Sequence, residues 1–251
     1  MFDKIKNITQ NRVFHISMAI IIFSIIFFTT GVVILKYNVE GETNMPFELS
    51  KITIISTCEG IDKQTQETKW NFDINQNNDI YLYINKNKNY TSQEAIKTIK
   101  IENINVEKNN EIGEIKFYRP NILDDGGNFK NSEENLINQI EYVGDLESNL
   151  KKLKISNQEG IVAFRYANSN VAEYSSNDDE INHSELLKKA GITEEDLQAK
   201  LTFDLTITIE SGIEYKANVS VDLPIKGVVE SGNSSQEITD LKNIIFKRTK
   251  N

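Results

Sequence analysis

The sequence predicts a mainly β protein, in which a single N-terminal transmembrane helix is followed by an antiparallel β-sandwich, Ig-like in architecture, with a short helical insert. A long uncharged apolar run stands near the N-terminus. Most of the later chain alternates apolar with polar residues, and turn residues interrupt that alternation at short intervals. We expect a cytoplasmic tail over 1–12, a membrane helix over 13–35, a spacer over 36–46 and the β-sandwich over 47–251, with 120–159 as the place for a sub-boundary.

The apolar run from Val13 to Leu35 has about 23 residues, and a helix needs about 20 to cross a hydrocarbon layer about 30 Å thick. The alternatives are a cleaved signal peptide and a buried helix. A signal peptide has a shorter apolar region and then a site of small residues. After Phe28 the sequence is TTGVVILKYN, with β-branched and bulky residues at these places. The pattern favours an uncleaved signal-anchor that contacts the lipid bilayer through residues 13–35.

The charges that flank this run predict its orientation. Lys4, Lys6 and Arg12 precede it, whereas Lys36 stands alone behind it and is followed by Glu40. Short loops rich in Lys and Arg stay in the cytoplasm. We therefore expect a single-pass protein of the plasma membrane, with the N-terminus cytoplasmic and the C-terminal domain outside.

The exported part should be acidic and free of disulfides. The chain has 28 basic and 37 acidic residues. Residues 1–36 contain four of the basic and one of the acidic residues, so the rest of the chain has 24 basic and 36 acidic residues and a formal net charge of −12. Such a surface is repelled from nucleic acid, so we expect no nucleic-acid partner. Cys58 is the single cysteine and cannot form an intramolecular disulfide. An extracellular domain without disulfides fits a bacterial cell envelope better than a eukaryotic lumen.

The first half of the exported part predicts several strands. The segment 47–57 is rich in Ile and Thr. The next two runs, WNFDIN and IYLYIN, alternate cleanly, and NQNND between them predicts a turn, so that 70–75 and 80–85 would form a hairpin. Further strands are predicted over 99–108 and over 114–119, where Pro120 ends the second.

The second half predicts a connection, one helical insert and a hairpin. We expect 120–159 to be a long connection with short helical pieces. Strand character returns over 160–176. Asn182 and Thr193 have the spacing of helix N-caps, and Gly191 is placed to end the first of the two short helices.

The hairpin carries the strongest β signal, with one strand over 201–209, a turn at Ser211-Gly212 and a second strand up to Pro224. A polar break, GNSSQE, follows. The last segment, 238–251, is compatible with a strand or a helix, and we favour a strand.

The search for catalytic and metal sites gives only weak candidates, so we expect no enzyme activity and no cofactor. The two histidines, His15 and His183, accompany no nucleophile motif, and one Cys with two distant His cannot form a zinc site. Two acidic clusters could hold calcium, but neither has the spacing of an EF-hand loop, and solvated loops are the simpler interpretation. Their members are Asp124, Asp125 and Asn128, and Asp178, Asp179 and Glu180.

Aromatic residues give the candidates for a binding surface. Trp70, Tyr81 and Tyr83 would lie near one another if the first hairpin forms, and such side chains can stack on sugars or form protein hot spots. Trp70 shares a face with Phe72 and Ile74, which favours core packing for it. The two tyrosines point the opposite way and are either covered or exposed.

These features predict a non-enzymatic interaction or accessory module of the bacterial cell envelope, with an envelope protein or a wall component as partner. A carbohydrate-binding protein or a carbohydrate-active enzyme that uses two carboxylates is the alternative, because such enzymes leave little local sequence signature. A membrane-tethered sensor is the second alternative. It would have to act through another protein, since the predicted tail of about a dozen residues cannot hold a signalling domain.

Overall fold

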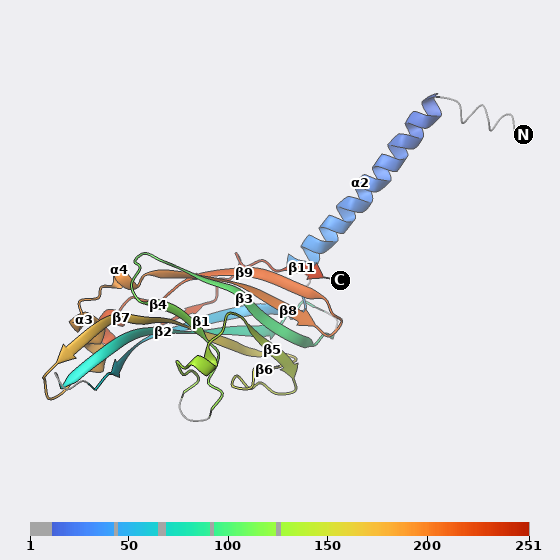
Figure 1. Ribbon diagram of the computed structural model, residues 1–251. Coiled ribbons are helices and arrows are strands. Elements are labelled where there is room, and N and C mark those ends of the chain that lie inside the picture. The colour runs from blue at the N-terminus through green and yellow to red at the C-terminus, as the bar shows by residue number, and fades with distance from the viewer. Residues whose placement is uncertain (1–11, 43–44, 65–68, 91–92, 124–126, 251) are drawn as a thin grey trace, which may run out of the picture.

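The structure is a computed structural model that describes residues 12–42, 45–64, 69–90, 93–123 and 127–250. It consists of one long N-terminal helix and a β domain (residues 45–250) built from two sheets (Figure 1). The prediction of a mainly β protein with one N-terminal apolar helix is confirmed.

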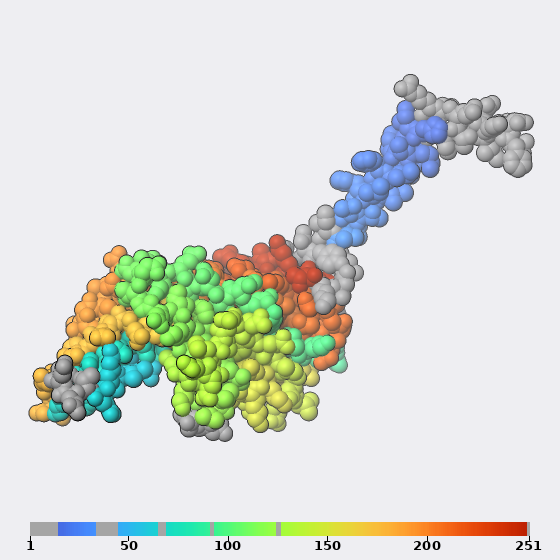
Figure 2. All heavy atoms as spheres, in the orientation of Figure 1, coloured from blue at the N-terminus to red at the C-terminus, as the bar shows by residue number. Residues whose placement is uncertain are grey.

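Helix α2 (Arg12–Glu42) extends away from the β domain, as Figures 1 and 2 show. Its segment His15–Val33 has a mean hydropathy of 2.5, and none of it is buried against the rest of the protein. It is long and apolar enough to span a membrane. The helix continues to Glu42, so most of the expected spacer 36–46 is helical.

The first sheet has the strand order β10-β1-β2-β7-β4 and the second the order β11-β9-β8-β3-β5-β6. The strands of the first sheet are β1 (Phe47–Asp62), β2 (Trp70–Lys86), β4 (Glu114–Tyr118), β7 (Gly160–Ser176) and β10 (Asn233–Ile238). Those of the second are β3 (Ile96–Lys108), β5 (Ile140–Asp145), β6 (Lys154–Ser156), β8 (Ala199–Ile209), β9 (Glu214–Asp222) and β11 (Lys247–Lys250). All pairs are antiparallel except β5 with β6, which pair in parallel.

The larger hydrophobic cluster lies between the two sheets. Alternate residues of β1, β2 and β7 meet alternate residues of β3, β8 and β9, and the rings of Phe164 and Phe203 contact edge to face at 5.3 Å. The predicted hairpin of the second half is β8 with β9, and its inward residues Leu201, Phe203 and Leu205 are all buried. Period-two alternation therefore identified the buried faces correctly.

A smaller hydrophobic cluster fills the end of the first sheet that lies far from α2. Phe72, Ile74 and Val171 of the sheet pack there against Leu186 and Leu187. The cover comes from three short helices, α3 (Leu186–Lys189), α4 (Glu194–Leu197) and α5 (Val228–Ser231). The predicted caps are present: the Asn182 side chain accepts a hydrogen bond from the Ser184 amide, and Thr193 forms a capping box with Asp196.

A polar belt separates the two clusters on the inner face of the first sheet. Its members are Ser56 of β1, Gln76 and Asn78 of β2, and Asn168 of β7, all buried. Asn78 lies opposite Ser56, and Gln76 lies opposite Asn168. Gln76 Nε2 donates to Ser56 Oγ at 3.2 Å, so the belt is partly bonded within itself.

The predicted hairpin over 70–85 is wrong, because β2 runs without interruption from Trp70 to Lys86. Its middle residues, Asn75 to Asp79, pair with β1 on one side, and Gln76 to Asp79 also pair with β7 on the other. Asn and Asp favour turns because their side chains can bond to their own backbone. Here distant residues provide those bonds, and the segment contains no Gly or Pro that would force a reversal.

The segment 120–159 also differs from the prediction. Besides a 3-10 turn over Glu133–Asn135 it contains β5 and β6, and the buried side chains Ile140, Tyr142 and Ile155 join the larger cluster. The predicted break GNSSQE is mostly strand β10, and the predicted final strand is β11. Both are short edge strands, for which the alternation signal is weak.

Candidate functional site

The candidate site lies on the outer face of the first sheet, where the β4–β5 connection (residues 119–139) crosses the strands. Its centre is an ion pair between Arg165 of β7 and Asp79 of β2, which are direct partners in the sheet. Arg165 Nε donates to Asp79 Oδ1 at 2.6 Å and Nη2 donates to Oδ2 at 3.1 Å. The two side chains are only 12% and 16% exposed, so this bidentate ion pair is largely shielded from solvent.

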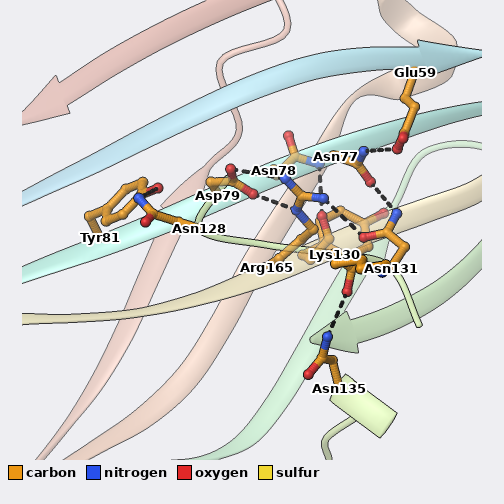
Figure 3. Close-up of polar contacts among 11 residues, drawn as sticks. Glu59, Asn77, Asn78, Asp79, Tyr81, Asn128, Lys130, Asn131, Asn135 and Arg165 are labelled. Carbon is orange, nitrogen blue, oxygen red and sulfur yellow. Dashed lines mark hydrogen bonds and ion pairs between the residues drawn. The ribbon is translucent and has the colours of Figure 1, made fainter. Parts of the chain in front are cut away.

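A chain of amide side chains extends from this pair across β2 to Glu59 of β1 (Figure 3). Arg165 Nη1 donates to Asn131 Oδ1 at 3.0 Å, and Asn131 Nδ2 donates to Asn77 Oδ1 at 2.8 Å. Asn77 Nδ2 in turn donates to Glu59 Oε2 of β1 at 2.8 Å. These residues, together with Asp79, are the polar network. It fastens the connection across β7, β2 and β1.

Phe129 of the connection completes the cover on the outer face. Its buried ring meets the Tyr81 ring edge to face at 6.1 Å and lies 5.2 Å from the guanidinium of Arg165. Asn128 Nδ2 donates to the Tyr81 hydroxyl at 3.3 Å. Burial is the largest cause that raises the pKa of Tyr81 above its ordinary value. Tyr81 is therefore covered by the connection.

Of the other two predicted binding residues, Tyr83 follows Tyr81 on the same face of β2, whereas Trp70 lies at the start of that strand. The ammonium group of Lys51 lies 4.3 Å from the centre of the Tyr83 ring. Trp70 stacks on Phe72 at 5.8 Å, and its ring nitrogen donates to the carbonyl of Asp178 at 3.0 Å. Because β2 is one continuous strand, Trp70 and Tyr81 are about 36 Å apart along it, at about 3.3 Å per residue. The structure does not bring the three aromatic residues together.

A groove with both apolar and polar lining lies beside the polar network, at the outer edge of β4. The Ile137 amide donates to the Phe117 carbonyl at 2.9 Å, which ties the connection to this edge. The groove has a volume of about 420 Å³ and is lined by residues 115–117 and 136–138. Ile115 and Leu136 are 39% and 45% exposed. We call these two side chains, with Phe117 and Ile137, the β4 groove.

The acidic clusters give no support for calcium. Asp124 and Asp125 lie outside the described residues, and Asn128 bonds to Tyr81. In the second cluster the carboxylate of Asp179 pairs with Lys69 at 2.7 Å. Within the part of the chain that the structure describes, no three His, Cys, Asp or Glu side chains are grouped so as to hold a metal ion.

The structure also shows the surroundings of His183 and Cys58. His183 contacts the Phe72 ring edge to face at 5.2 Å. Cys58 packs against the smaller cluster, and burial raises the pKa of its thiol to about 11. A thiol with that pKa stays protonated at neutral pH and is a poor nucleophile.

A second charged group lies on the outer face of the second sheet. Lys216 of β9 pairs with Asp204 of β8 at 2.9 Å and with Glu102 of β3 at 3.1 Å. Burial raises the pKa of Asp204, but hydrogen bonds from Asn218, Asn103 and Lys216 outweigh it and lower this pKa to about 2. Hydrogen bonds from Lys100 and Lys216 likewise lower the pKa of Glu102. Both carboxylates are ionised at neutral pH, so neither can donate a proton there.

Sequence reasoning missed the polar network. A signal was present, because Arg165 interrupts the apolar run GIVAFRYA and a charge on a half-buried strand needs a partner. The partner could not be identified, since Asp79 had been assigned to a turn. Each side chain of the network has a partner within it, and the groove beside it is open.

Comparisons of this chain with protein-family models, with curated proteins and with solved structures found no match.

Proposed function

We propose that the protein is a single-pass, membrane-anchored module of a bacterial cell envelope. Its Ig-like β-sandwich would lie outside the plasma membrane and bind a partner protein without catalysing a reaction. The observation that carries this proposal is the surface of α2. Large apolar side chains of its segment 15–33 are exposed, with Phe23 and Phe27 exposed by 77% and 80%. A helix segment that is apolar on all sides and is not buried by the rest of the protein, as 15–33 is, has hydrocarbon as its favourable surroundings.

The flanking charges support the orientation. Basic residues precede α2, and the β domain that follows carries the acidic excess. An outside location also agrees with a domain that has a single cysteine and relies on two hydrophobic clusters for its stability.

The β4 groove is the surface that we propose for the partner. Ile115 and Leu136 are apolar and exposed, and Lys116 and Asn138 lie at the same groove. An apolar centre with polar neighbours is typical of protein interfaces. Backbone contacts with β4 hold Leu136 and Ile137 in place, because Leu136 bridges to Tyr118 and the Ile137 amide donates to the Phe117 carbonyl, so that binding would require little ordering of the chain.

The carbohydrate-active alternative receives less support. A glycosidase needs one carboxylic acid that is protonated near neutral pH beside one that is ionised. The pKa values of Asp204 and Glu102, which share Lys216, are both lowered. Asp79 is already engaged by Arg165.

The test uses full-length protein expressed in intact cells, with a photo-crosslinking amino acid at Leu136. We expect a crosslink to one defined envelope protein, which disappears when Ile115→Glu is added. The matched control carries the crosslinker at Leu146, which is 85% exposed but lies on the turn after β5. Equal products from both positions would refute the groove as the binding surface. Release of the protein from membranes by alkaline carbonate would refute the anchor.

A further inference from the structure

The start of β1 has an open backbone edge, beyond the point where β10 ends. Strand β10 covers β1 from Thr57 back to Ile52, which lies opposite Ile238. The chain then leaves the first sheet as the connection 239–246 and returns as β11 of the second sheet. Among the described residues, residues 47–49 of β1 therefore have a strand partner on the β2 side only.

The backbone groups of Phe47 and Leu49 point towards this open edge. The Asn87 amide donates to the Pro46 carbonyl at 2.9 Å, so residue 46 faces β2. Residues 47–49 lie opposite 86, 85 and 84 without a shift, and successive residues of an antiparallel ladder bond to alternate sides. Glu48 therefore also faces β2, whereas Phe47 and Leu49 face away from it. In the described part of the chain, no backbone group bonds to them on that side.

A groove of about 560 Å³ lies between this edge and the connection 239–246. The connection contributes Leu241, Ile244 and Ile245 to it, and Ile245 is 46% exposed. Backbone N–H and C=O groups that lack partners beside apolar side chains cost free energy until they are bonded. Donors and acceptors two residues apart, next to an apolar wall, suit an extended peptide, whose side chains point to alternate faces.

The groove lies at the end of the β domain that is nearest to α2. Met45 lines it and follows Glu42, the last residue of α2, by three residues, so the two Cα atoms are at most about 11 Å apart. The connection leads into β11, which contacts α2 and lies beside the base of the helix (Figure 1). If α2 spans a membrane, an occupant of the groove must be close to the bilayer surface.

The charged side chains that line the groove favour a basic occupant. They are Lys242, which has Asp240 as a partner at 3.9 Å, and Glu48, which forms no ion pair with a described residue. Glu40 and Glu42 of α2 and the residues of β11 are not part of this lining. A basic side chain of the occupant would therefore complement Glu48.

We propose that the groove binds an extended segment of a second membrane protein, which adds to β1 as a strand in line with β10. The segment exchanges hydrogen bonds with the backbone of Phe47 and Leu49. It places an apolar side chain against Ile245 and a basic one near Glu48. The inference rests on the proposed membrane anchor and concerns a surface separate from the β4 groove.

The first test asks whether the edge is open in the isolated protein. Amide hydrogen exchange of the full chain is followed by NMR in phosphatidylcholine nanodiscs. We expect the Phe47 and Leu49 amides to exchange at least about tenfold faster than the Glu48 amide, which faces β2. Slow exchange of all three amides would mean that the edge is already paired, and would overturn the proposal.

The second test identifies the occupant in intact cells, with a photo-crosslinking amino acid at Ile245 of the full-length protein. The chain from Val33 to Met45 spans at most about 25 Å, of which about 14 Å is helix. We therefore expect one crosslinked protein, joined within about ten residues of its own apolar span, because eight extended residues cover that distance.

Two charge variants control this crosslink. Glu48→Lys should remove the product, whereas Glu107→Lys, which changes an exposed residue of β3 outside the groove, should leave it intact. Products with lipid alone, with a second copy of this chain or with many proteins would overturn the proposal. So would a product that is unchanged in Glu48→Lys.

The third test uses a synthetic peptide with the sequence of the crosslinked segment. Added to the nanodiscs, it should slow exchange of the Phe47 and Leu49 amides at least about tenfold and leave Glu48 unchanged. The same peptide N-methylated at alternate residues cannot complete the ladder and should not protect them. Equal protection by both peptides would show contact without strand addition and would overturn the proposal.

The same preparations distinguish this inference from the anchor on which it rests. If the chain enters nanodiscs but forms no crosslink from Ile245, only the added strand is wrong. If the chain does not enter nanodiscs at all, the anchor fails, and this inference fails with it.

Discussion

Two buried tyrosines, Tyr142 and Tyr166, differ in the hydrogen bonds that their hydroxyl groups make. Tyr142 Oη donates to the Ala163 carbonyl at 2.7 Å and accepts from the Ala163 amide at 3.1 Å. It thereby satisfies the backbone of β7 at a place that β4, which pairs with residues 165–169, does not reach. The hydroxyl of Tyr166 is equally buried, but it has no hydrogen-bond partner among the described residues. Burial raises the pKa of both tyrosines far above the ordinary value.

We expect the replacement of Tyr by Phe to have opposite effects on stability at these two positions. Tyr142→Phe leaves an amide and a carbonyl unsatisfied and should lower the free energy of unfolding by about 1–3 kcal/mol. Tyr166→Phe removes an unpaired polar group and should change it by less than about 1 kcal/mol, in the stabilising direction. Urea unfolding of both variants in a non-ionic detergent checks this. A large loss of stability in Tyr166→Phe would mean that its hydroxyl has a partner.

Asp204 predicts a dependence of stability on pH. Its pKa is about 2 in the folded state, below the ordinary value of 3.8, so folding stabilises the ionised form. The contribution, about 2 kcal/mol at about 1.4 kcal/mol per pKa unit, is complete above pH 4 and is lost as the pH falls towards 2. Asp204→Asn should therefore be less stable than the native protein at pH 7, and the difference should shrink below pH 4.

The check is a series of urea unfolding curves between pH 2 and 7. Asp222→Asn, which changes an exposed carboxylate of the neighbouring strand β9, serves as the control. A difference between native protein and Asp204→Asn that is the same at every pH would contradict the assigned pairing with Lys216.

At the scale of the elements, the placement of β5 decides how the β4–β5 connection crosses the first sheet. Strand β5 pairs with β3 over Thr98–Ile101, and just beyond this pairing Gly144 approaches the backbone of Ile96. A Cβ atom at Gly144 would lie 1.9 Å from the Ile96 carbonyl oxygen. Only a glycine allows the two backbones to come this close.

Gly144→Ala should therefore push β5 away from β3 and destabilise the β domain by about 2 kcal/mol or more, because a backbone carbonyl cannot move aside as a side chain can. Gly127→Ala is the matched control, since a Cβ there meets no atom within 4 Å. Thermal unfolding of the two variants gives the comparison. Equal midpoints would contradict the close approach.

At the scale of the whole molecule, the buried polar belt divides the β domain into two parts that differ in size. The larger cluster lies between two sheets, whereas the smaller one is covered by helices of four residues each. Such a cover buries less apolar surface and should open at a lower free energy than the region between the sheets. The part far from α2 is then the more mobile one.

Hydrogen exchange checks this division. We expect amides of β2 near Phe72 and Ile74 to exchange faster than those of Ile80–Ile84 in the same strand. Leu186→Ala, which should cost about 2–5 kcal/mol as a buried Leu truncation, should accelerate exchange in the first group alone. Uniform acceleration along β2 would show that the two clusters unfold as one unit.

The sequence by itself determined the apolar helix, the acidic balance of the β domain and the faces that its strands bury. These follow from composition and from the period of two, which a single chain segment carries within itself. The alternation in IYLYIN puts Ile80, Leu82 and Ile84 on one face, which is buried, and the same parity holds through the polar belt to Ile74 and Phe72.

Only the tertiary structure decided which segments are neighbours. Asn75 to Asp79 have the composition of a turn, yet they form the middle of a strand because Glu59, Asn131 and Arg165 supply their partners. The cover of Tyr81 by Phe129 and the contact of β11 with α2 likewise join residues far apart in the chain. A polar residue is stable in a turn or in a buried strand according to where its hydrogen-bond partners lie, and that position is set by the packing of the whole fold.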